Sequence, residues 1–313
     1  MIINRWCGLM LLAAGLVIGT ALSPAVQNVP IGYAAQSSAP KVRADAAARI
    51  DSYFTAQLHA KRFSGSVLLA QGSTVLLSKG YGMADWDAQI HNSASTEFPF
   101  PFVGNAEFAA AAILQLEQAG KLRDAETICT YIPHCPAAWA PITVHELLTF
   151  TTGILDYPNA PPVGFPFGQA LTLRQLLDQL GALPLKYKPD AGFSVNPSPP
   201  IEEYLVGQVS GESFGAYVQR HFLGPLGLTH TGYYLHYPSL PRFATAYQSS
   251  KSPGTVSDAS DIGGAMYSTV TDFYRWQNAL LSGQVLSAAS TAKLLTPAFR
   301  FCPPTCALPG YST

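Results

Sequence analysis

A short β-hairpin near the start of the chain limits most strongly what this sequence can fold into. Residues 65–70 and 74–78 are two β-rich runs, and Gly72 and Ser73 between them are typical of a tight hairpin turn. A two-stranded hairpin is marginally stable alone, and its open edge invites pairing with a further strand. The chain must therefore cover one face of this hairpin with other elements.

Helices are the predicted covering elements. Residues 44–58 show the apolar spacing of an amphipathic helix, and 108–122 form a strong helical pattern that Gly120 and Lys121 end. The other predicted helices cover residues 144–150, 173–180, 201–209, 214–222, 268–281 and 287–295. The predicted order is therefore a helix, a hairpin and then a long helical and loop-rich stretch.

The composition is that of a folded and nearly neutral protein. Of the 313 residues, 48% are hydrophobic and 12% are charged, which suits one large domain or two modest ones and is unlike a disordered chain. The formal net charge is −1, and Lys and Arg are scattered along the sequence. These values argue against nucleic acids and anionic membranes as partners.

The first segment of the chain differs from the rest. Arg5 precedes an apolar run over 7–22, and small residues follow it, as in a secretory signal with cleavage expected after Ala25 or Ala34. The alternative is an uncleaved membrane anchor, since the run extends to about the 20 residues that a span requires. Either reading predicts export, to the periplasm or the cell exterior. The expected segments are a signal or anchor, a linker and one folded domain, over residues 1–34, 35–43 and 44–313.

Four cysteines follow the predicted signal, namely Cys129, Cys135, Cys302 and Cys306. An even number in an exported chain suggests disulfides, and of the three connectivities the local pairs Cys129–Cys135 and Cys302–Cys306 are the simplest. No histidine lies at ligand spacing beside these cysteines, so a metal site is disfavoured. Neither a metal nor another cofactor is expected.

Several segments of the chain resemble one protein family in the same order. Residues 63–82 are similar to its opening hairpin, 110–122 to the helix that normally begins with the nucleophile, and 142–153 to its Ile-Thr-x-x-x-Leu-Leu-Thr-His-Thr-Ser-Gly signature. Residues 209–211 and 225–232 match the region after its second catalytic motif, and 266–272 resemble the start of a later helix. Each match is weak alone, but together they are collinear. The chain thus resembles the serine β-lactamase and penicillin-binding-protein-like hydrolases, of the class C β-lactamase type.

This resemblance implies an α+β fold and the place of an active site. The family has an antiparallel sheet flanked by helices and an inserted helical domain, which here would cover about residues 108–240, with the active site between the two. The sheet takes two strands from the start of the chain and the others from its end. Because the chain ends at Thr313, the C-terminal strands are expected to be missing, and the stability of such a truncated fold to be poor.

The resemblance also implies a catalytic apparatus, and its first motif is absent. A Ser at a helix N-terminus attacks the carbonyl, and a Lys one turn later accepts its proton. These positions fall near Phe102 or Val103 and near Asn105 or Ala106, and no Ser or Lys occurs anywhere from 97 to 120. The nucleophile and its base are therefore both expected to be lost.

The two remaining motifs are absent as well. Residues 193–196 read Phe-Ser-Val-Asn where the family has Phe-Ser-Tyr-Ser-Asn, so the Tyr is lost and Asn196 keeps the amide only if one residue has been deleted. Phe150 and Thr152 replace the His and the Ser of the Leu-Leu-Thr-His-Thr-Ser-Gly string. The Lys-Thr-Gly or His-x-Gly strand is expected downstream of Leu295, and the chain ends before it.

Three literal motif matches elsewhere are interpreted as chance. They are the Ser-x-x-Lys of Ser290 and Lys293, the Tyr-x-Asn of Tyr157 and Asn159, and the His-x-Gly of His230 and Gly232. Their order in the chain is reversed relative to the family, and short motifs often arise by chance.

A vestigial pocket is expected at the start of the helix that would have carried the nucleophile. Its candidate residues are Phe102, Asn105, Glu107 and Asn196. Asn105 and Glu107 are predicted to cap and charge this helix N-terminus. The aromatic residues before it are predicted to fill the vacated space as core, with a ligand platform as the alternative, namely Phe98, Phe100 and Phe102.

Three hypotheses about function follow. The leading one is an exported β-lactamase-related protein that is catalytically inactive and retains at most a binding role, for a small molecule or a cell-wall-like peptide. The second is an active serine hydrolase of β-lactams, D-Ala peptides or esters with relocated residues such as Ser64, Ser66 or Ser194. The third is an envelope interaction protein that uses the apolar strip 98–103.

Overall fold

The structure is a computed structural model that describes residues 46–101, 103–157, 171–195, 197–234, 242–245, 247–249, 252–253 and 264–298. All of these residues lie in the segment Val42–Thr313. The predicted signal or anchor and the linker lie outside the described residues, as do Phe102, Asn196, Cys302 and Cys306. Within the described ranges, none of the helices combines the length and the apolar character that a membrane span requires.

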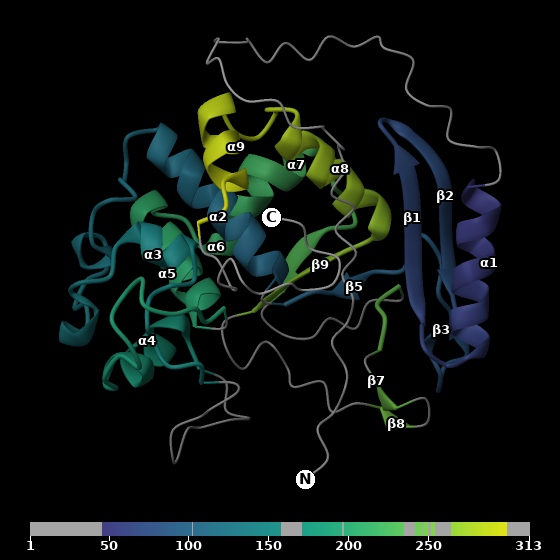
Figure 1. The fold of residues 1–313 in the computed structure, drawn as a ribbon, viewed down its shortest axis with the longest axis horizontal. Helices are drawn as coiled ribbons and strands as arrows, with labels where there is room; N and C mark the ends of the chain where they lie inside the picture. Colours follow the sequence, from purple (N-terminus) through teal and green to yellow (C-terminus); the bar gives the residue numbers. More distant parts are fainter. Residues whose placement is uncertain are drawn as a thin grey trace, which may run out of the picture. The chain divides into compact units, whose positions relative to one another are not determined.

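The predicted hairpin and the helix before it are confirmed (Figure 1). These elements are α1 (Ala46–His59), β1 (Gly65–Gln71) and β2 (Thr74–Tyr81). The two strands are antiparallel, and Gly72 in the turn between them has a φ of 55°, which glycine adopts without a steric penalty. Asp51 fixes α1 on β2, because it accepts hydrogen bonds from Lys79 Nζ at 2.7 Å and from the Tyr81 hydroxyl at 2.8 Å.

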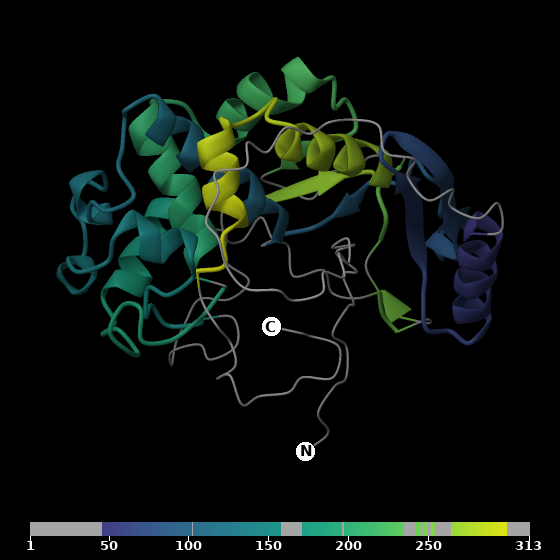
Figure 2. The same cartoon turned by 45° about the horizontal axis from the view of Figure 1, so that its top comes forward.

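A second sheet of three strands does not follow from the sequence pattern. In spatial order its strands are β5 (Phe98–Pro99), β9 (Ala265–Ser268) and β6 (Gly232–Tyr234), with β9 in the middle and both pairings antiparallel (Figure 2). Two more antiparallel pairs join β3 (Met83–Asp85) to β4 (Ile90–His91) and β7 (Tyr247–Ser249) to β8 (Ser252–Pro253). The helix predicted over 268–281 begins later, as α8 (Val270–Leu281), because β9 takes the residues up to Ser268.

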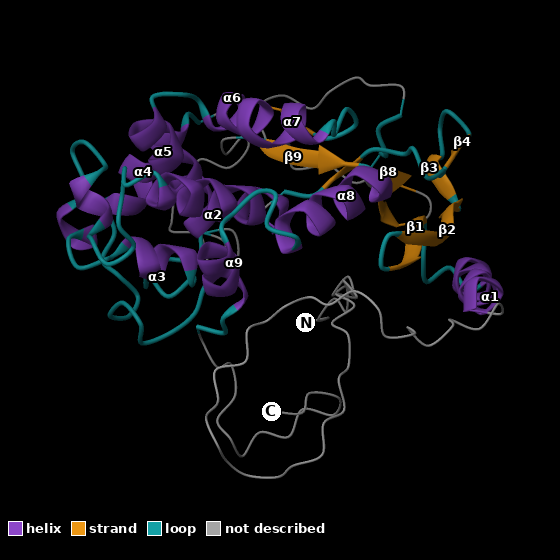
Figure 3. Ribbon diagram, turned by 90° about the horizontal axis from the view of Figure 1, so that it is seen from above, coloured by secondary structure: helices purple, strands orange, loops and turns teal. Residues whose placement is uncertain are grey.

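Helices form the larger part of the described domain, as Figure 3 shows, and the α+β class is confirmed. The other α-helices are α2 (Val103–Gln118), α3 (Val144–Leu148), α4 (Leu173–Gly181), α5 (Ser198–Ser210), α6 (Phe214–Val218), α7 (Gly224–Leu226) and α9 (Ala288–Leu295). Short 3-10 helices cover Ile128–Thr130 and Ala137–Trp139, and Gln219–Leu223 forms a π-helical turn. The main apolar core centres on α2 and α5, and Phe108 stacks on Trp276 of α8 with ring centroids 4.1 Å apart.

α2 begins at Val103 rather than at the predicted Phe108. Gly104 and Asn105 are poor helix formers, so the local pattern is weak there, and tertiary packing decides the boundary. The ring of Phe100 packs so closely on Gly104 that a Cβ at this position would lie 2.3 Å from it. Phe100 also meets Phe273 edge-on at 5.3 Å, and it is partly buried and packs against the main core.

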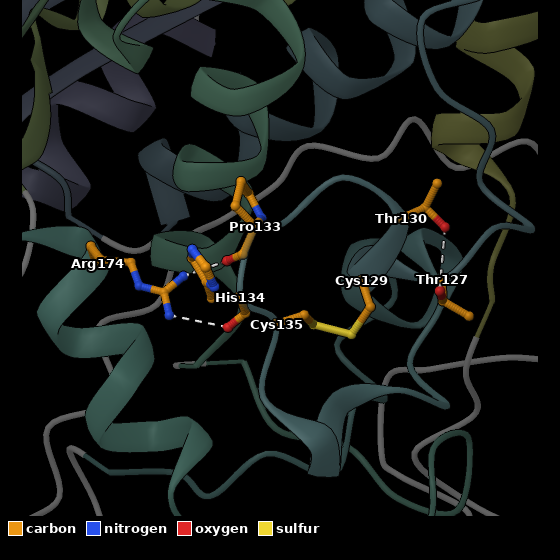
Figure 4. The surroundings of a disulfide bond; sticks show 7 residues. All are labelled: Thr127, Cys129, Thr130, Pro133, His134, Cys135 and Arg174. Atoms are coloured by element: carbon orange, nitrogen blue, oxygen red, sulfur yellow. Dashed lines mark hydrogen bonds between the residues drawn. A yellow bond between two sulfur atoms is a disulfide. The ribbon is translucent and has the colours of Figure 1, made fainter.

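One of the two predicted local disulfides is formed. Cys129 and Cys135 are bonded in the loop region between α2 and α3 (Figure 4). Arg174 of α4 donates hydrogen bonds to the backbone carbonyls of Pro133 at 2.6 Å and of His134 at 3.1 Å. The disulfide therefore cross-links this loop internally, and Arg174 holds the same loop against α4. The second predicted pair lies outside the described residues.

Candidate functional site

The start of α2 is where the family resemblance places the nucleophile. Val103 is the first residue of this helix, and it is 49% exposed, so the position is open to solvent as an attacking group would need to be. Its side chain has no lone pair and no proton to transfer. Within the next turn stand Asn105, a neutral amide, and Ala106, a buried methyl group. No described side chain at this helix start can attack a carbonyl carbon.

Asn105 connects α2 to two other elements instead of capping the helix. Its buried amide Nδ2 donates to Glu203 Oε1 at 2.5 Å and to the carbonyl of Gly264 at 3.0 Å. Its Oδ1 accepts a hydrogen bond from the backbone N–H of Met266 at 2.8 Å. The predicted capping role is wrong, because the helix begins at Val103 and the Asn105 side chain is committed to α5 and the β9 region.

Glu203 of α5 is the acceptor at the centre of this network. Its Oε2 accepts a hydrogen bond from the Tyr233 hydroxyl at 2.6 Å, and the residue is only 2% exposed. Burial raises the pKa of Glu203 to about 8, and the hydrogen bonds from Tyr233 and Asn105 oppose this rise. Burial first, and then the charge of Glu203, also raises the pKa values of Tyr157 and Tyr233.

Glu202, which precedes Glu203, is equally buried, and no hydrogen bond from the described residues offsets the cost of burying it. It is 1% exposed, and neither of its carboxyl oxygens has a hydrogen-bond partner in the described part of the chain. Burial, followed by the charge of Glu203, raises the pKa of Glu202 well above its usual range. None of the ion pairs between described residues involves Glu202 or Glu203. An unpaired buried carboxylate is unfavourable, which is the physical cause of this rise in the pKa of Glu202.

Glu107 faces away from the network of Asn105. Its Oε1 accepts hydrogen bonds from Trp276 Nε1, at 2.7 Å, and from the amide of Gln277, both on α8. Burial raises the pKa of Glu107, against the effect of these two donors. The first turn of α2 contains no acidic residue, so the prediction that Glu107 charges the helix N-terminus is also wrong.

The loop before α5 carries what is left of the second motif. The rings of Phe193 and Phe150 meet edge to face with centroids 5.9 Å apart, and the Ser194 N–H donates to the Phe150 carbonyl at 2.9 Å. Phe150 has a φ of 60°, an uncommon conformation for a bulky residue. Of the four predicted pocket residues, the structure describes Asn105 and Glu107, and their side chains bind different elements.

The serines considered as replacement nucleophiles have no base beside them. The Ser64 hydroxyl donates to the carbonyl of Tyr81 at 3.3 Å, and that of Ser66 donates to the carbonyl of Ser93 at 2.6 Å. The Ser194 hydroxyl is buried without a hydrogen-bond partner among the described residues. In the described ranges, no hydrogen bond joins any of these three hydroxyls to a Lys, a His or a carboxylate.

The residues of the literal motif matches have structural contacts of their own. The Lys293 ammonium group lies 2.6 Å from Asp124 Oδ2. Tyr157 is fully buried, and Nδ1 of His230 lies 3.1 Å from Glu97 Oε1. Among the described residues, no three His, Cys, Asp or Glu side chains gather as a metal site would require.

The buried pair Glu202 and Glu203 is a feature of this region that the sequence pattern did not indicate. The available signal is two consecutive glutamates within the apolar helical run 201–206, since charged side chains are almost never fully buried without a partner. The sequence pattern does not indicate which of the two glutamates faces inward, and in the structure both are buried.

Comparison with known proteins identifies the family. The model of the family described as Beta-lactamase matches residues 50–301, so this chain belongs to the β-lactamase family. PbpX of Bacillus subtilis, which carries the name of a penicillin-binding protein, is 31% identical over 242 residues, covering 75% of this chain and 59% of that protein. The teichoic acid D-alanine hydrolase of Staphylococcus aureus is 26% identical over 205 residues, covering 64% of this chain and 47% of that protein.

Solved structures show the same fold. The penicillin-binding protein of Bacillus halodurans matches with a TM-score of 0.67 and 26% identity, covering 78% of this chain and 77% of that one. The chain spans 59% or less of the length of the two curated relatives, so their activities do not transfer to it by similarity alone.

Proposed function

We propose that this chain is an exported member of the β-lactamase family that does not form an acyl-enzyme. The observation that carries the proposal is that Phe102 and Val103, where the nucleophile is expected, lie in a segment without Ser or Lys from 97 to 120, at the start of α2. The family fold is retained around that position, whereas the groups for covalent chemistry are absent.

Acyl transfer needs an oxygen nucleophile that forms a bond to the carbonyl carbon while a base takes its proton and the leaving group departs. Val103 offers no such oxygen. Asn105 is not a base, and both ends of its amide are already hydrogen-bonded. Glu203 is the nearest titratable partner of Asn105, but it is 2% exposed and lies behind that amide. A ligand at the start of α2 therefore meets no group among the described residues that it could acylate.

Two features support export. The apolar run over 7–22 after Arg5 has the character of a secretory signal or anchor. The disulfide between Cys129 and Cys135 is of a kind that persists in oxidising compartments and is rare in the cytosol. Fractionation of cells that express the full chain should therefore recover it outside the cytosol, and a cytosolic protein with free Cys129 and Cys135 thiols would contradict export.

The names of the relatives suggest which ligands to test. They concern penicillin and the D-alanine of teichoic acid, so the proposed partner is a small molecule or cell-wall-like peptide of that chemistry. The full chain is incubated with nitrocefin, a D-alanyl-D-alanine peptide and a nitrophenyl ester, with an active class C β-lactamase as the positive control.

No hydrolysis above the uncatalysed rate is expected for any of the three compounds. Hydrolysis that disappears in Ser64→Ala, Ser66→Ala or Ser194→Ala would refute the proposal and establish the active alternative with relocated residues.

A further inference from the structure

An apolar cleft of about 650 Å³ lies between α2, α3 and the end of α9, whose ribbons are drawn in Figure 3. Its wall includes the side chains of Leu114, Leu148, Phe150, Phe193, Leu294 and Pro297. An apolar surface of this extent is rarely left open to water, so its presence indicates that something covers it. The volume lies within the range of about 300–1,000 Å³ that is typical of small-molecule sites, and a pair of aromatic side chains can enter it.

The chain itself forms part of the wall after α9 ends at Leu295. Thr296, Pro297 and Ala298 all line the cleft, and Ala298 is the last residue that the structure describes. Because each residue extends the chain by at most about 3.6 Å, residues 299–301 begin within roughly 11 Å of Ala298. A segment tethered this closely has an effective concentration at the cleft of roughly millimolar or more, so a modest affinity is enough for it to occupy the cleft.

The residues that follow this wall match it in chemistry. They are Phe299, Arg300 and Phe301. In an extended segment, residues two apart point to the same side, so both phenyl rings can enter the cleft while Arg300 points away from it. Phe150 and Phe193 already meet edge to face in the wall, with ring centroids 5.9 Å apart, and further aromatic rings pack favourably on such a pair.

The charged groups beside the cleft favour a basic segment over an acidic one. The Lys293 ammonium lies 2.8 Å from Glu117 Oε2 and 2.6 Å from Asp124 Oδ2, so one cation faces two carboxylates. His145 Nδ1 lies 3.8 Å from Asp124 Oδ2, and this residue adds a positive charge only when it is protonated. The segment from 299 to 313 contains one Arg and neither Asp nor Glu, so its charge has the sign that this rim accepts.

We propose that residues 299–301 dock into this cleft of their own chain, with the rings of Phe299 and Phe301 packed against the corner formed by Phe150 and Phe193. The cleft is therefore an intramolecular docking site for the segment after α9 and is not open to a free ligand.

This docking site is separate from the start of α2. Its residues on that helix are Ala110 and Leu114, whereas the nucleophile is expected near Val103. At about 1.5 Å of rise per residue, Ala110 lies roughly 10 Å further along the helix axis than Val103. The docking of residues 299–301 thus does not depend on the proposed loss of acylation.

A photo-reactive phenylalanine analogue tests where the segment lies. Phe301 is replaced in the full chain by benzoylphenylalanine, which keeps an aromatic side chain and cross-links to neighbouring C–H groups on irradiation. Peptide mapping should place the cross-links on 110–114 of α2 or on 145–150, across the cleft from α9. The same analogue at Tyr311 is the matched control and should not cross-link to these residues.

Isotope labelling shows which copy of the chain supplies the segment. A mixture of unlabelled and ¹⁵N-labelled chains is irradiated, and the masses of the cross-linked peptides are measured. Each cross-link should join two peptides of the same label, since the tether favours the segment of the same chain. Peptides of mixed label would assign the cleft to the segment of a second copy and would contradict the proposal.

Replacement of the two phenylalanines tests the occupancy of the cleft. Phe299→Ser and Phe301→Ser together should open it to Nile red, a neutral apolar dye whose fluorescence rises on binding. Full burial of one Phe side chain stabilises by more than a tenfold change in affinity requires, so the wild type should bind the dye at least about tenfold more weakly. Adding Leu294→Glu should remove the gained binding, whereas adding Leu295→Glu, at a residue that is 59% exposed and outside the lining, should preserve it. Tyr311→Ser is the matched control and should bind the dye as the wild type does.

An absence of cross-links from position 301 to α2 or 145–150, equal cross-linking from position 311, or equal affinity of the wild type and the double variant for the dye would overturn the proposal. Thermal unfolding shows whether each variant retains the fold, and the cross-linking result does not depend on the serine variants.

Discussion

Glu203→Gln should remove much of the pH dependence of the stability of this protein. The carboxyl of Glu203 is 2% exposed, accepts hydrogen bonds from the neutral groups of Asn105 and Tyr233, and has no cation beside it among the described residues. Gln has the same shape, can accept the hydrogen bond from Asn105 through its oxygen, and can donate to the Tyr233 oxygen. It cannot ionise, so the substitution isolates the effect of the charge.

The size of the effect follows from the two protonation equilibria. Burial raises the pKa of Glu203 from its usual 4.5 to about 8 in the folded protein. Below about pH 4.5 both states hold the proton, and pH has no effect through this group. Between about 4.5 and about 8 the unfolded state has lost the proton and the folded state still holds it, so the free energy of unfolding falls by about 1.4 kcal/mol for each pH unit.

Across that whole window the loss is on the order of 5 kcal/mol, which is comparable with the total stability of many domains. Glu202 acts in the same direction, because burial raises its pKa as well. Through Glu203 and Glu202 the free energy of unfolding is therefore expected to fall as the pH rises through this window.

Urea unfolding at about pH 5 and about pH 8 measures the difference, with the buried Trp139 and Trp276 as fluorescent reporters. The wild type should lose stability between the two conditions, and Glu203→Gln should lose much less and be the more stable protein at the higher pH. Asp87→Asn, at an exposed residue in the turn between β3 and β4, is the matched control and should behave as the wild type. A wild type whose stability does not change with pH, or a variant with an unchanged slope, would refute the reasoning.

Three further substitutions probe other parts of the structure. Replacing Cys129 and Cys135 together by Ala should lower the free energy of unfolding by about 2 kcal/mol, since the disulfide closes a short loop, and a reductant should have this effect on the wild type but not on the variant. Asn105→Ala leaves a buried carboxyl, a carbonyl and an N–H without their partner and should cost about 2–4 kcal/mol in urea unfolding; a loss below that of an exposed Asn→Ala would contradict its bridging role. Val103→Ser restores a hydroxyl at the start of α2 but no base, so the variant should stay unlabelled by penicillin, and rapid labelling would show that an unrecognised base is present.

The elements with a regular local pattern could be predicted from the sequence. The hairpin of β1 and β2 has two runs of β-forming residues and a glycine turn, and α8 and α9 have clear helical periodicity. The sheet of β5, β9 and β6 could not be predicted, because its strands have only two to four residues and β5 pairs with β9 across more than half of the chain. Such pairing leaves no local signal.

The candidate site also has one part that the sequence could predict and another that it could not. The loss of Ser and Lys at the start of α2 is a statement about residue identity, and any alignment within a residue or two reveals it. The roles of Asn105 and Glu107 were predicted wrongly, since they depend on partners that are far away in the sequence: Glu203 for the first and Trp276 for the second. α2 begins at Val103, five residues before the predicted Phe108. Asn105 therefore lies inside the helix and hydrogen-bonds to other elements instead of capping the helix.

Covalent labelling tests the central claim most directly. The full chain is incubated with an excess of penicillin or of a fluorophosphonate, and its intact mass is measured against that of an active class C β-lactamase treated in the same way. Because neither Phe102 nor Val103, where the nucleophile is expected, carries a hydroxyl, and no hydrogen bond in the described ranges joins Ser64, Ser66 or Ser194 to a Lys, a His or a carboxylate, the mass should stay unchanged with both reagents. A stoichiometric increase in mass that peptide mapping assigns to any serine would contradict the proposal that this chain cannot be acylated.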